Sequence, residues 1–188
     1  MGGHTEHILE DIIEKCLHGD RGAYYELYKR FSRSMYNVAF RIVHDDDEAH
    51  DVLQEGFISA FKNLKHYRGE ATFGAWLKRI VVNKAINAVK RKKWDRFPDD
   101  GPVEKPEEDE DALRGFPFTV EKVKRAMDRL PHGYRVVLSL YLLEGYDHGE
   151  IAEILGISES TSKSQFNRSK KKLRELLLEE GWANRGSC

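Results

Sequence analysis

The stretch GYDHGEIAEILGISESTSKSQFNRSKKKLRELL, residues 145–177, determines how the rest of the chain is interpreted. Its first part carries apolar side chains at the three-to-four spacing of a helix, ending at Leu155. Gly156 then supplies a residue that adopts a left-handed backbone without strain, and Ser158 is a suitable N-cap for another helix. These signals together predict a helix-turn-helix.

The second helix of this pair is rich in short polar and basic side chains. Short hydrogen-bonding groups near a helix N-terminus suit base edges, and the cations that follow suit backbone phosphates. The alternative is an ordinary helical hairpin with a solvated charged face. We favour the interpretation that this helix binds the bases of duplex DNA, because the turn residues and the polar content both agree with it. The residues concerned are Thr161, Lys163, Ser164, Gln165, Asn167, Arg168, Lys170, Lys171 and Lys172.

Charge is distributed unevenly along the chain, although its formal net value is only -1. Residues 62–96 hold eleven Lys or Arg against two acids, whereas residues 99–111 hold eight acids against one Lys. A strongly basic surface therefore precedes a strongly acidic stretch. Any binding of nucleic acid to the basic regions should weaken as salt rises.

The first half of the chain has the apolar periodicity of four helices, over about residues 8–17, 20–43, 46–64 and 72–94. The fourth presents a polar, basic side that suits single-stranded nucleic acid, where cations hold phosphates and amides read base edges. A basic solvated helix with its aromatics in the core fits equally well, and Trp76 is expected in that core. The polar side comprises Arg79, Asn83, Lys84, Asn87, Lys90 and Arg91.

The third predicted helix also has a polar face, which carries Asp51, Gln54 and Glu55. This face could be solvated or could bind a partner, and the helix alone leaves both possibilities open. His44 and the three Asp residues that follow it precede this helix. We interpret them as helix caps instead of a metal site, because three consecutive carboxylates point in different directions.

Residues 97–118 are expected to form a flexible acidic linker, since they hold four of the five prolines and the whole acid run. A solvated tether is the main interpretation. The alternative is that its acids cover the basic surfaces as a mimic of nucleic acid. Helical periodicity resumes at residue 119, and the last helix should fray after Leu178, near Gly181. The sequence thus predicts an all-α chain of two small helical domains, residues 1–96 and 119–182, joined by this linker.

No motif in the sequence indicates an enzyme. A Ser/His/Asp grouping, a glycine-rich phosphate loop and ligand-spaced Cys or His residues are all absent, so no catalytic residue, cofactor or metal is expected. Cys16 and Cys188 give no disulfide framework. The chain has no apolar run of membrane-spanning length and no signal-peptide pattern, and a cytoplasmic protein is expected.

The chain resembles bacterial RNA polymerase sigma factors of the extracytoplasmic function (ECF) group of the sigma-70 family. The resemblance covers nearly the whole chain and is carried by DVLQEGFISAFKNL (51–64), YRGEATFGAWLKRIVVNKAINAVKRKK (67–93) and LPHGYRVVLSLYLLEGYDHGEIAEILGISESTSKSQFNRSKKKL (130–173). It implies an alternative sigma factor that binds core RNA polymerase and directs promoter-specific transcription initiation. Residues 1–96 would be sigma region 2 and residues 119–182 sigma region 4.

The resemblance also implies a division of labour among particular residues. Core polymerase, through the clamp helices of its largest subunit, would be bound by Asp51, Gln54 and Glu55. The melted minus-ten promoter element would be held by Tyr67, Phe73, Arg79, Asn83, Asn87, Lys90 and Arg91. The minus-thirty-five element would be read in the major groove by Thr161, Lys163, Ser164, Gln165, Arg168 and Lys171.

Further partners follow from the same resemblance: the polymerase flap and an anti-sigma factor, which could be membrane-bound. No small-molecule substrate is implied. The linker would thread toward the RNA exit path of the polymerase.

Two rival functions differ in what the purified chain would do. A one-component helix-turn-helix regulator would bind its promoter tightly without polymerase, and it would need a sensor pocket where this chain has a basic helix. A protein-only helical adaptor would start no promoter-specific transcription when mixed with core polymerase.

Overall fold

The computed structural model describes residues 2–91 and 119–183, and within these ranges the regular secondary structure is entirely helical. This confirms the all-α prediction. The chain forms two compact units, Met1–Lys93 and Trp94–Cys188, each of which is described by itself. The predicted linker, residues 97–118, lies outside the described residues. None of the described helices combines the length and the apolar content that crossing a membrane requires.

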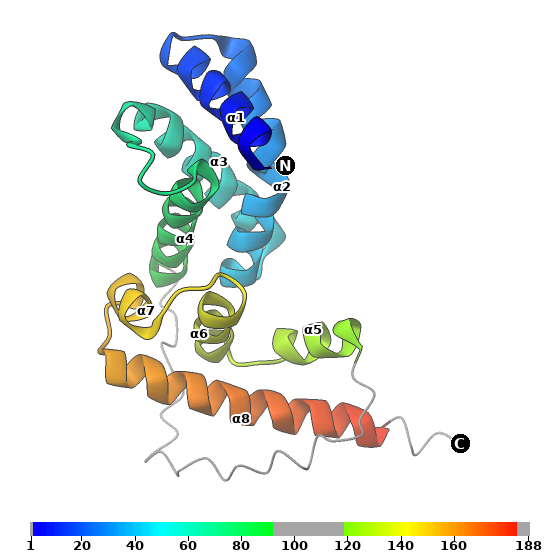
Figure 1. The fold of residues 1–188 in the computed structure, drawn as a ribbon. Coiled ribbons are helices and arrows are strands. Elements are labelled where there is room, and N and C mark those ends of the chain that lie inside the picture. The colour runs from blue at the N-terminus through cyan, green and yellow to red at the C-terminus, as the bar shows by residue number, and fades with distance from the viewer. Residues whose placement is uncertain (1, 92–118, 184–188) are drawn as a thin grey trace. The chain divides into compact units, whose positions relative to one another are not determined.

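The first unit is a helical bundle in which α2 (Arg21–Val43), α3 (Asp46–Lys62) and α4 (Phe73–Arg91) pack against one another (Figure 1). Helix α1 (Gly2–Leu17) packs on α2, and the short helix η1 (Leu64–His66) follows α3. Each long helix turns one apolar stripe inward, which is the arrangement that the sequence periodicity predicts. The largest fully buried side chains of this core are Phe73, Leu27, Ile42, Leu77, Ile86, Val81 and Val82.

The segment between α2 and α3 is built from caps. His44 ends α2 with a left-handed backbone, φ 57°, and its amide donates to the Phe40 carbonyl. The Asp45 carboxylate accepts from the Glu48 amide at the start of α3. The described residues contain no cluster of His, Cys, Asp and Glu arranged to hold a metal. The cap hydrogen bonds of His44 and Asp45 confirm the interpretation of this segment as helix caps.

Helices α3 and α4 approach closely at Gly56. A Cβ atom added to Gly56 would lie 2.9 Å from Cγ2 of Val81. Such a contact is shorter than carbon atoms tolerate, and the β-branched Val81 side chain has little freedom to move away. The absence of a side chain at Gly56 therefore sets the spacing of the two helices.

We expect Gly56→Ala to lower the free energy of unfolding by about 1 kcal/mol. The gain in helix propensity is about 1 kcal/mol, and overpacking of a close contact costs about 1–3 kcal/mol. Urea denaturation measures the difference. In a Val81→Ala background the clash is relieved, so Gly56→Ala should stabilise there. A stabilising effect in the unaltered chain would contradict this account of the contact.

The second unit contains α5 (Val120–Asp128), α6 (His132–Leu142), α7 (His148–Leu155) and α8 (Glu159–Ala183). Helix α8 packs against each of the other three. The backbone of this helix remains helical to Ala183, two residues beyond Gly181, near which the sequence predicts fraying. A single glycine costs a helix only about 1 kcal/mol, which is too little to end it without a stronger stop signal.

A buried arginine joins α5 to α6. Arg135 is 7% exposed, and its guanidinium donates to the carbonyl oxygens of Asp128 and Leu130 at 3.1 and 3.3 Å. Burial lowers the pKa of Arg135 from its usual value, while Asp128 acts in the opposite direction. The side chain thus donates to carbonyl groups at the end of α5 and just beyond it, where a helix leaves backbone acceptors for other groups to satisfy.

Candidate nucleic-acid interface

The helix-turn-helix forms as the sequence predicts. Asp147 and Glu150 make a capping box at the start of α7, with hydrogen bonds of 2.8 and 3.0 Å. Gly156 ends α7 in the left-handed region, φ 71°. The Ser158 hydroxyl accepts from the Thr161 amide at 3.0 Å and so caps α8. These short-range interactions fix the turn.

An aromatic and polar cluster joins α6, α7 and α8. The ring of His148 stacks on Tyr141 at 4.6 Å between centroids and meets Phe166 edge-on at 5.5 Å. Nδ1 of His148 also lies 3.0 Å from the hydroxyl of Ser162, a buried residue of α8. The cluster holds the first helix of the motif against the second and so orients the outer face of α8.

The pKa of His148 lies below its usual value of 6.5, chiefly because of burial and then because of the nearby Lys163 cation; Glu159 and Asp147 act in the opposite direction. The unfolded chain therefore binds a proton at this residue more readily than the folded chain. The stability that neutral His148 contributes is fully present above its unfolded pKa and is lost as the pH falls through the folded value.

We therefore expect the free energy of unfolding of the second unit to decrease as the pH is lowered from neutral to mildly acidic. His148→Asn should reduce this dependence, whereas the exposed His18, on the first unit, provides a control whose replacement by Asn leaves it unchanged. Thermal melts across the pH range measure the effect. A pH dependence that is the same in His148→Asn as in the unaltered chain would contradict the assignment.

Helix α8 has two distinct faces. The inward face consists of Ser162, Gln165, Phe166 and Ser169, all buried. Positions three and four residues apart on the opposite side make an outward face. We call this side the α8 polar face; it comprises Lys163, Ser164, Asn167, Arg168, Lys171 and Arg174.

Gln165 was expected among the base-reading residues, and the structure contradicts this. Its side chain lies on the inward face of α8 and is 6% exposed. Two residues of the α8 polar face were not assigned to the minus-thirty-five element: Asn167, which the sequence analysis named only among the polar residues of this helix, and Arg174, which it did not name. Counting from Lys163 in steps of four and three would have found them, because Asn167, Lys171 and Arg174 recur on the same side of a helix.

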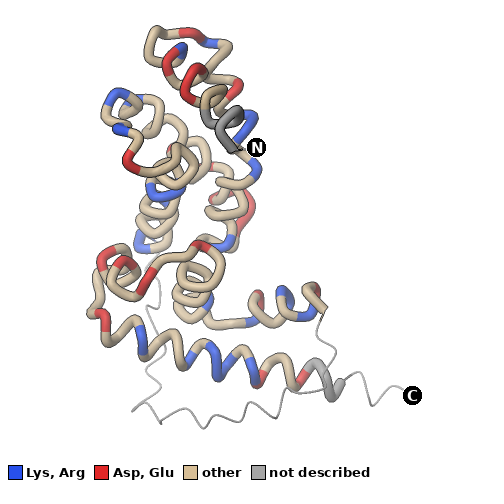
Figure 2. Tube along the Cα trace, viewed as in Figure 1, with Lys and Arg blue, Asp and Glu red and all other residues tan. Residues whose placement is uncertain are grey.

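The electrostatics of the α8 polar face vary along the helix. Nζ of Lys163 lies 2.6 Å from the carboxylate of Glu159 in the first turn. Beside this face, Nζ of Lys170 lies 5.0 Å from the centre of the Phe166 ring. Figure 2 shows that Lys and Arg recur along α8 beyond this first acid. The polar side chains with hydroxyl and amide groups thus come near the N-terminus, and the cations extend over the following turns.

A second polar face lies on α4 of the first unit. Arg79, Asn83 and Asn87 follow one another at four-residue intervals, and all three are exposed. Lys90 and Arg91 continue this face to the end of the helix and are also exposed. The structure therefore brings these five predicted residues together on one face, which we call the α4 basic face.

The aromatic residues around the start of α4 do not all lie where the sequence predicts. Phe73 was expected to contact DNA, but it is 1% exposed and packs against Phe31, Tyr67 and Trp76. Trp76, expected in the core, is only partly buried. Tyr67 is partly exposed, and its hydroxyl donates to the Ala71 carbonyl at 2.8 Å. Tyr67 and Trp76, 5.3 Å apart, are therefore the rings available at this surface.

The polar face of α3 is exposed as predicted, at Asp51, Gln54 and Glu55. Ile58 continues the same face one turn later and is 53% exposed, a feature that the sequence analysis missed. An apolar side chain bordered by acids and amides is typical of a surface that binds another protein. We call these four residues the α3 docking face.

Two family models match the chain. Residues 27–95 match sigma-70 region 2 and residues 121–173 match sigma-70 region 4. The first unit therefore carries the α3 docking face and the α4 basic face within a region 2 match, and the second carries the helix-turn-helix within a region 4 match.

Curated relatives agree with these matches over most of the chain. The chain is 30% identical to the ECF RNA polymerase sigma factor SigM of Mycobacterium tuberculosis over 189 residues, which covers 99% of this chain and 91% of the relative. It is 29% identical to the RNA polymerase sigma-H factor of Pseudomonas aeruginosa, covering 92% of this chain and 95% of the relative.

Solved structures support the fold. The sigma factor RpoE of Bartonella quintana, solved with the anti-sigma factor NepR, superposes with a TM-score of 0.53 at 19% identity, covering 82% of this chain and 96% of that one. CnrH, solved with the cytosolic domain of CnrY, gives a TM-score of 0.51 at 22% identity, covering 88% and 94%. From the family matches and the relatives together, the chain belongs to the ECF group of the sigma-70 family of RNA polymerase sigma factors.

Proposed function

We propose that this chain binds core RNA polymerase and directs it to promoters of a particular sequence, as a transcription initiation factor and not as an enzyme. The observation that carries the proposal is the presence, in one chain, of a region 2 match with an exposed basic face and a region 4 match with a helix-turn-helix. The cytoplasm is where such a protein would work.

The α3 docking face is the proposed contact with the clamp helices of the polymerase. Its acids and amide surround Ile58, so a partner could bury one apolar side chain at the centre while pairing with charge at the rim. The flap is a second proposed contact. An anti-sigma factor is a further proposed partner, because the similar sigma factor RpoE was solved in complex with the anti-sigma factor NepR. A partner that covers either region would prevent initiation.

The two nucleic-acid faces are proposed to bind different forms of promoter DNA. The α4 basic face, with Tyr67 and Trp76 beside it, suits the melted minus-ten strand, since cations hold phosphates, amides meet base edges and rings stack on bases. The α8 polar face suits the major groove of the minus-thirty-five duplex, with Thr161 at the edge of the helix start.

This mechanism needs no covalent chemistry. Residues that bind separated bases favour the open form of the promoter over the closed form, and they do so by as much as their affinities for the two forms differ. The chain would thus shift an equilibrium once polymerase has opened the duplex. Promoter binding by the chain alone should accordingly be weak.

In vitro transcription with core polymerase and a genomic promoter library tests the proposal. We expect transcripts from a defined subset of promoters only when the chain is added. Tight promoter binding without polymerase would instead support a one-component regulator. A failure to start any specific transcript, despite binding to core polymerase, would support a protein-only adaptor.

A further inference from the structure

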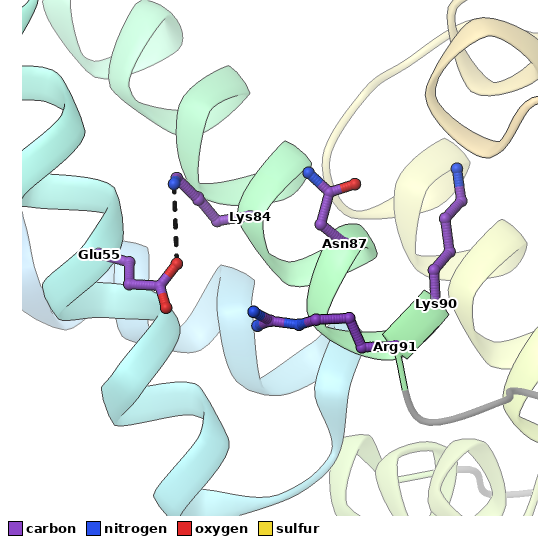
Figure 3. Close-up of a pocket in the computed structure, with 5 residues that line it drawn as sticks. All are labelled: Glu55, Lys84, Asn87, Lys90 and Arg91. Atoms are coloured by element: carbon purple, nitrogen blue, oxygen red, sulfur yellow. Dashed lines mark ion pairs between the residues drawn. The ribbon is translucent and has the colours of Figure 1, made fainter.

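A cationic hollow opens on the first unit where α4 passes α3. It has a volume of about 440 Å³ and is lined by Glu55 of α3 and by Lys84, Asn87, Lys90 and Arg91 of α4 (Figure 3). Three cations, an amide and one carboxylate line this hollow. Such a donor set suits an oxyanion with several acceptor oxygens, of which a backbone phosphate is the example closest to the proposed function.

Lys84 is the one cation of this set that lies outside the α4 basic face. Asn87, Lys90 and Arg91 belong to the α4 basic face, whereas Lys84 lies at its edge next to α3. Its ammonium group lies 3.7 Å from the carboxylate of Glu55, and Figure 3 shows the two side chains pointing toward one another across the helices. Glu55 is thus paired with the cation that a phosphate in the hollow would contact.

Glu55 also belongs to the α3 docking face, where it lies one helical turn from Asp51. The same carboxylate can therefore pair with Lys84 or with a partner protein. The side chains of Lys84 and Glu55 are 36% and 49% exposed, so their ion pair is weak. Either group can therefore exchange this pair for another at little cost in free energy. The two proposed interfaces of this unit consequently share one residue.

We propose that Lys84 binds a backbone phosphate of promoter DNA in this hollow, and that Glu55 competes for Lys84 until core polymerase engages Glu55. This inference rests on the proposed function, because it assumes that DNA and polymerase bind these faces. It gives polymerase binding a direct effect on DNA affinity: removal of one carboxylate from the hollow adds one phosphate contact.

The test uses the full chain without polymerase and a fluorescein-labelled oligo-dT strand, followed by fluorescence anisotropy. Glu55→Gln should raise the affinity about two- to fivefold at low salt, as expected for loss of an exposed competing pair. Because one more phosphate is neutralised, the slope of log K against log salt should steepen by about 0.7. For a duplex of equal length, Glu55→Gln should also raise the affinity, and the slope of log K against log salt should steepen by about 0.9.

Two variants make the test specific. Asp51→Asn removes the same charge from the same face of α3 but from a residue that is not the partner of Lys84, so it should change affinity less than Glu55→Gln does. Lys84→Gln should abolish the effect of Glu55→Gln when the two are combined. Inorganic phosphate, compared with chloride at equal ionic strength, should not displace the strand; displacement would assign the hollow to a free anion instead.

Equal gains from Glu55→Gln and Asp51→Asn would overturn the inference, since they would reveal a general effect of charge. Persistence of the gain in the Lys84→Gln background would also overturn it. Both results are compatible with promoter-specific transcription by the unaltered chain, so a failure of this inference is distinguishable from a failure of the proposed function.

Discussion

Asp51→Arg is expected to weaken the binding of core RNA polymerase by several kcal/mol, because the reversal places a cation opposite the cation with which Asp51 is proposed to pair. Asp51 is exposed in the middle of α3, so the substitution changes the docking face without disturbing the buried stripe. Arginine is a good helix former, and the fold should therefore be retained. Titration of labelled chain with core polymerase measures the affinity.

Glu26→Arg is the matched control for this experiment. Glu26 is an exposed acid in α2 of the same bundle, and the substitution changes the net charge by the same amount at a position outside the docking face. We expect its polymerase affinity to equal that of the unaltered chain. Equal affinities for all three proteins would refute the docking face, whereas equal losses in both variants would indicate a long-range charge effect.

A second readout separates a binding defect from a loss of function. If Asp51→Arg acts only on polymerase affinity, an excess of the variant should restore specific transcription. Ile58→Ser should act in the same direction, because it removes the apolar side chain that the docking face leaves exposed. A transcription defect that excess protein does not correct would place the role of Asp51 in a later step.

Local signals in the sequence were sufficient to predict the elements of the fold. The turn at Gly156, the cap at Ser158 and the caps around His44 depend on residues within four positions of one another. Apolar periodicity identified the inward stripes for the same reason, because both ends of each interaction lie on one helix. The all-α class and the helix-turn-helix followed directly.

The candidate sites were predicted less well where side chains depend on distant partners. Phe73 is buried because α2 contributes Phe31 to the same cluster, which no local pattern reveals. The pair between Lys84 and Glu55 likewise joins two helices. Resemblance to a family indicated which helices are proposed to bind DNA, but the orientation of each side chain required the packed unit.

Arg168→Ala is expected to weaken recognition of the minus-thirty-five element by about 1–3 kcal/mol if it removes a contact to a base edge. Arg168 lies on the α8 polar face, opposite the buried residues. Run-off transcription by the holoenzyme from a promoter with an intact or a scrambled element measures the preference. Lys171→Ala, which removes a proposed phosphate contact, should lower transcription from both promoters equally and reduce salt dependence.

Gln165→Met tests whether Gln165 faces the core, as the structure places it, or contacts DNA, as the sequence predicts. Gln165 is on the inward face, and its carbonyl oxygen is buried without a hydrogen bond among the described residues. Methionine fills a similar volume without a polar group, so promoter preference should be unchanged and stability equal or greater. A loss of preference in Gln165→Met that matches the loss in Arg168→Ala would contradict the outward orientation proposed for α8, because only a rotated helix would present Gln165 to the groove.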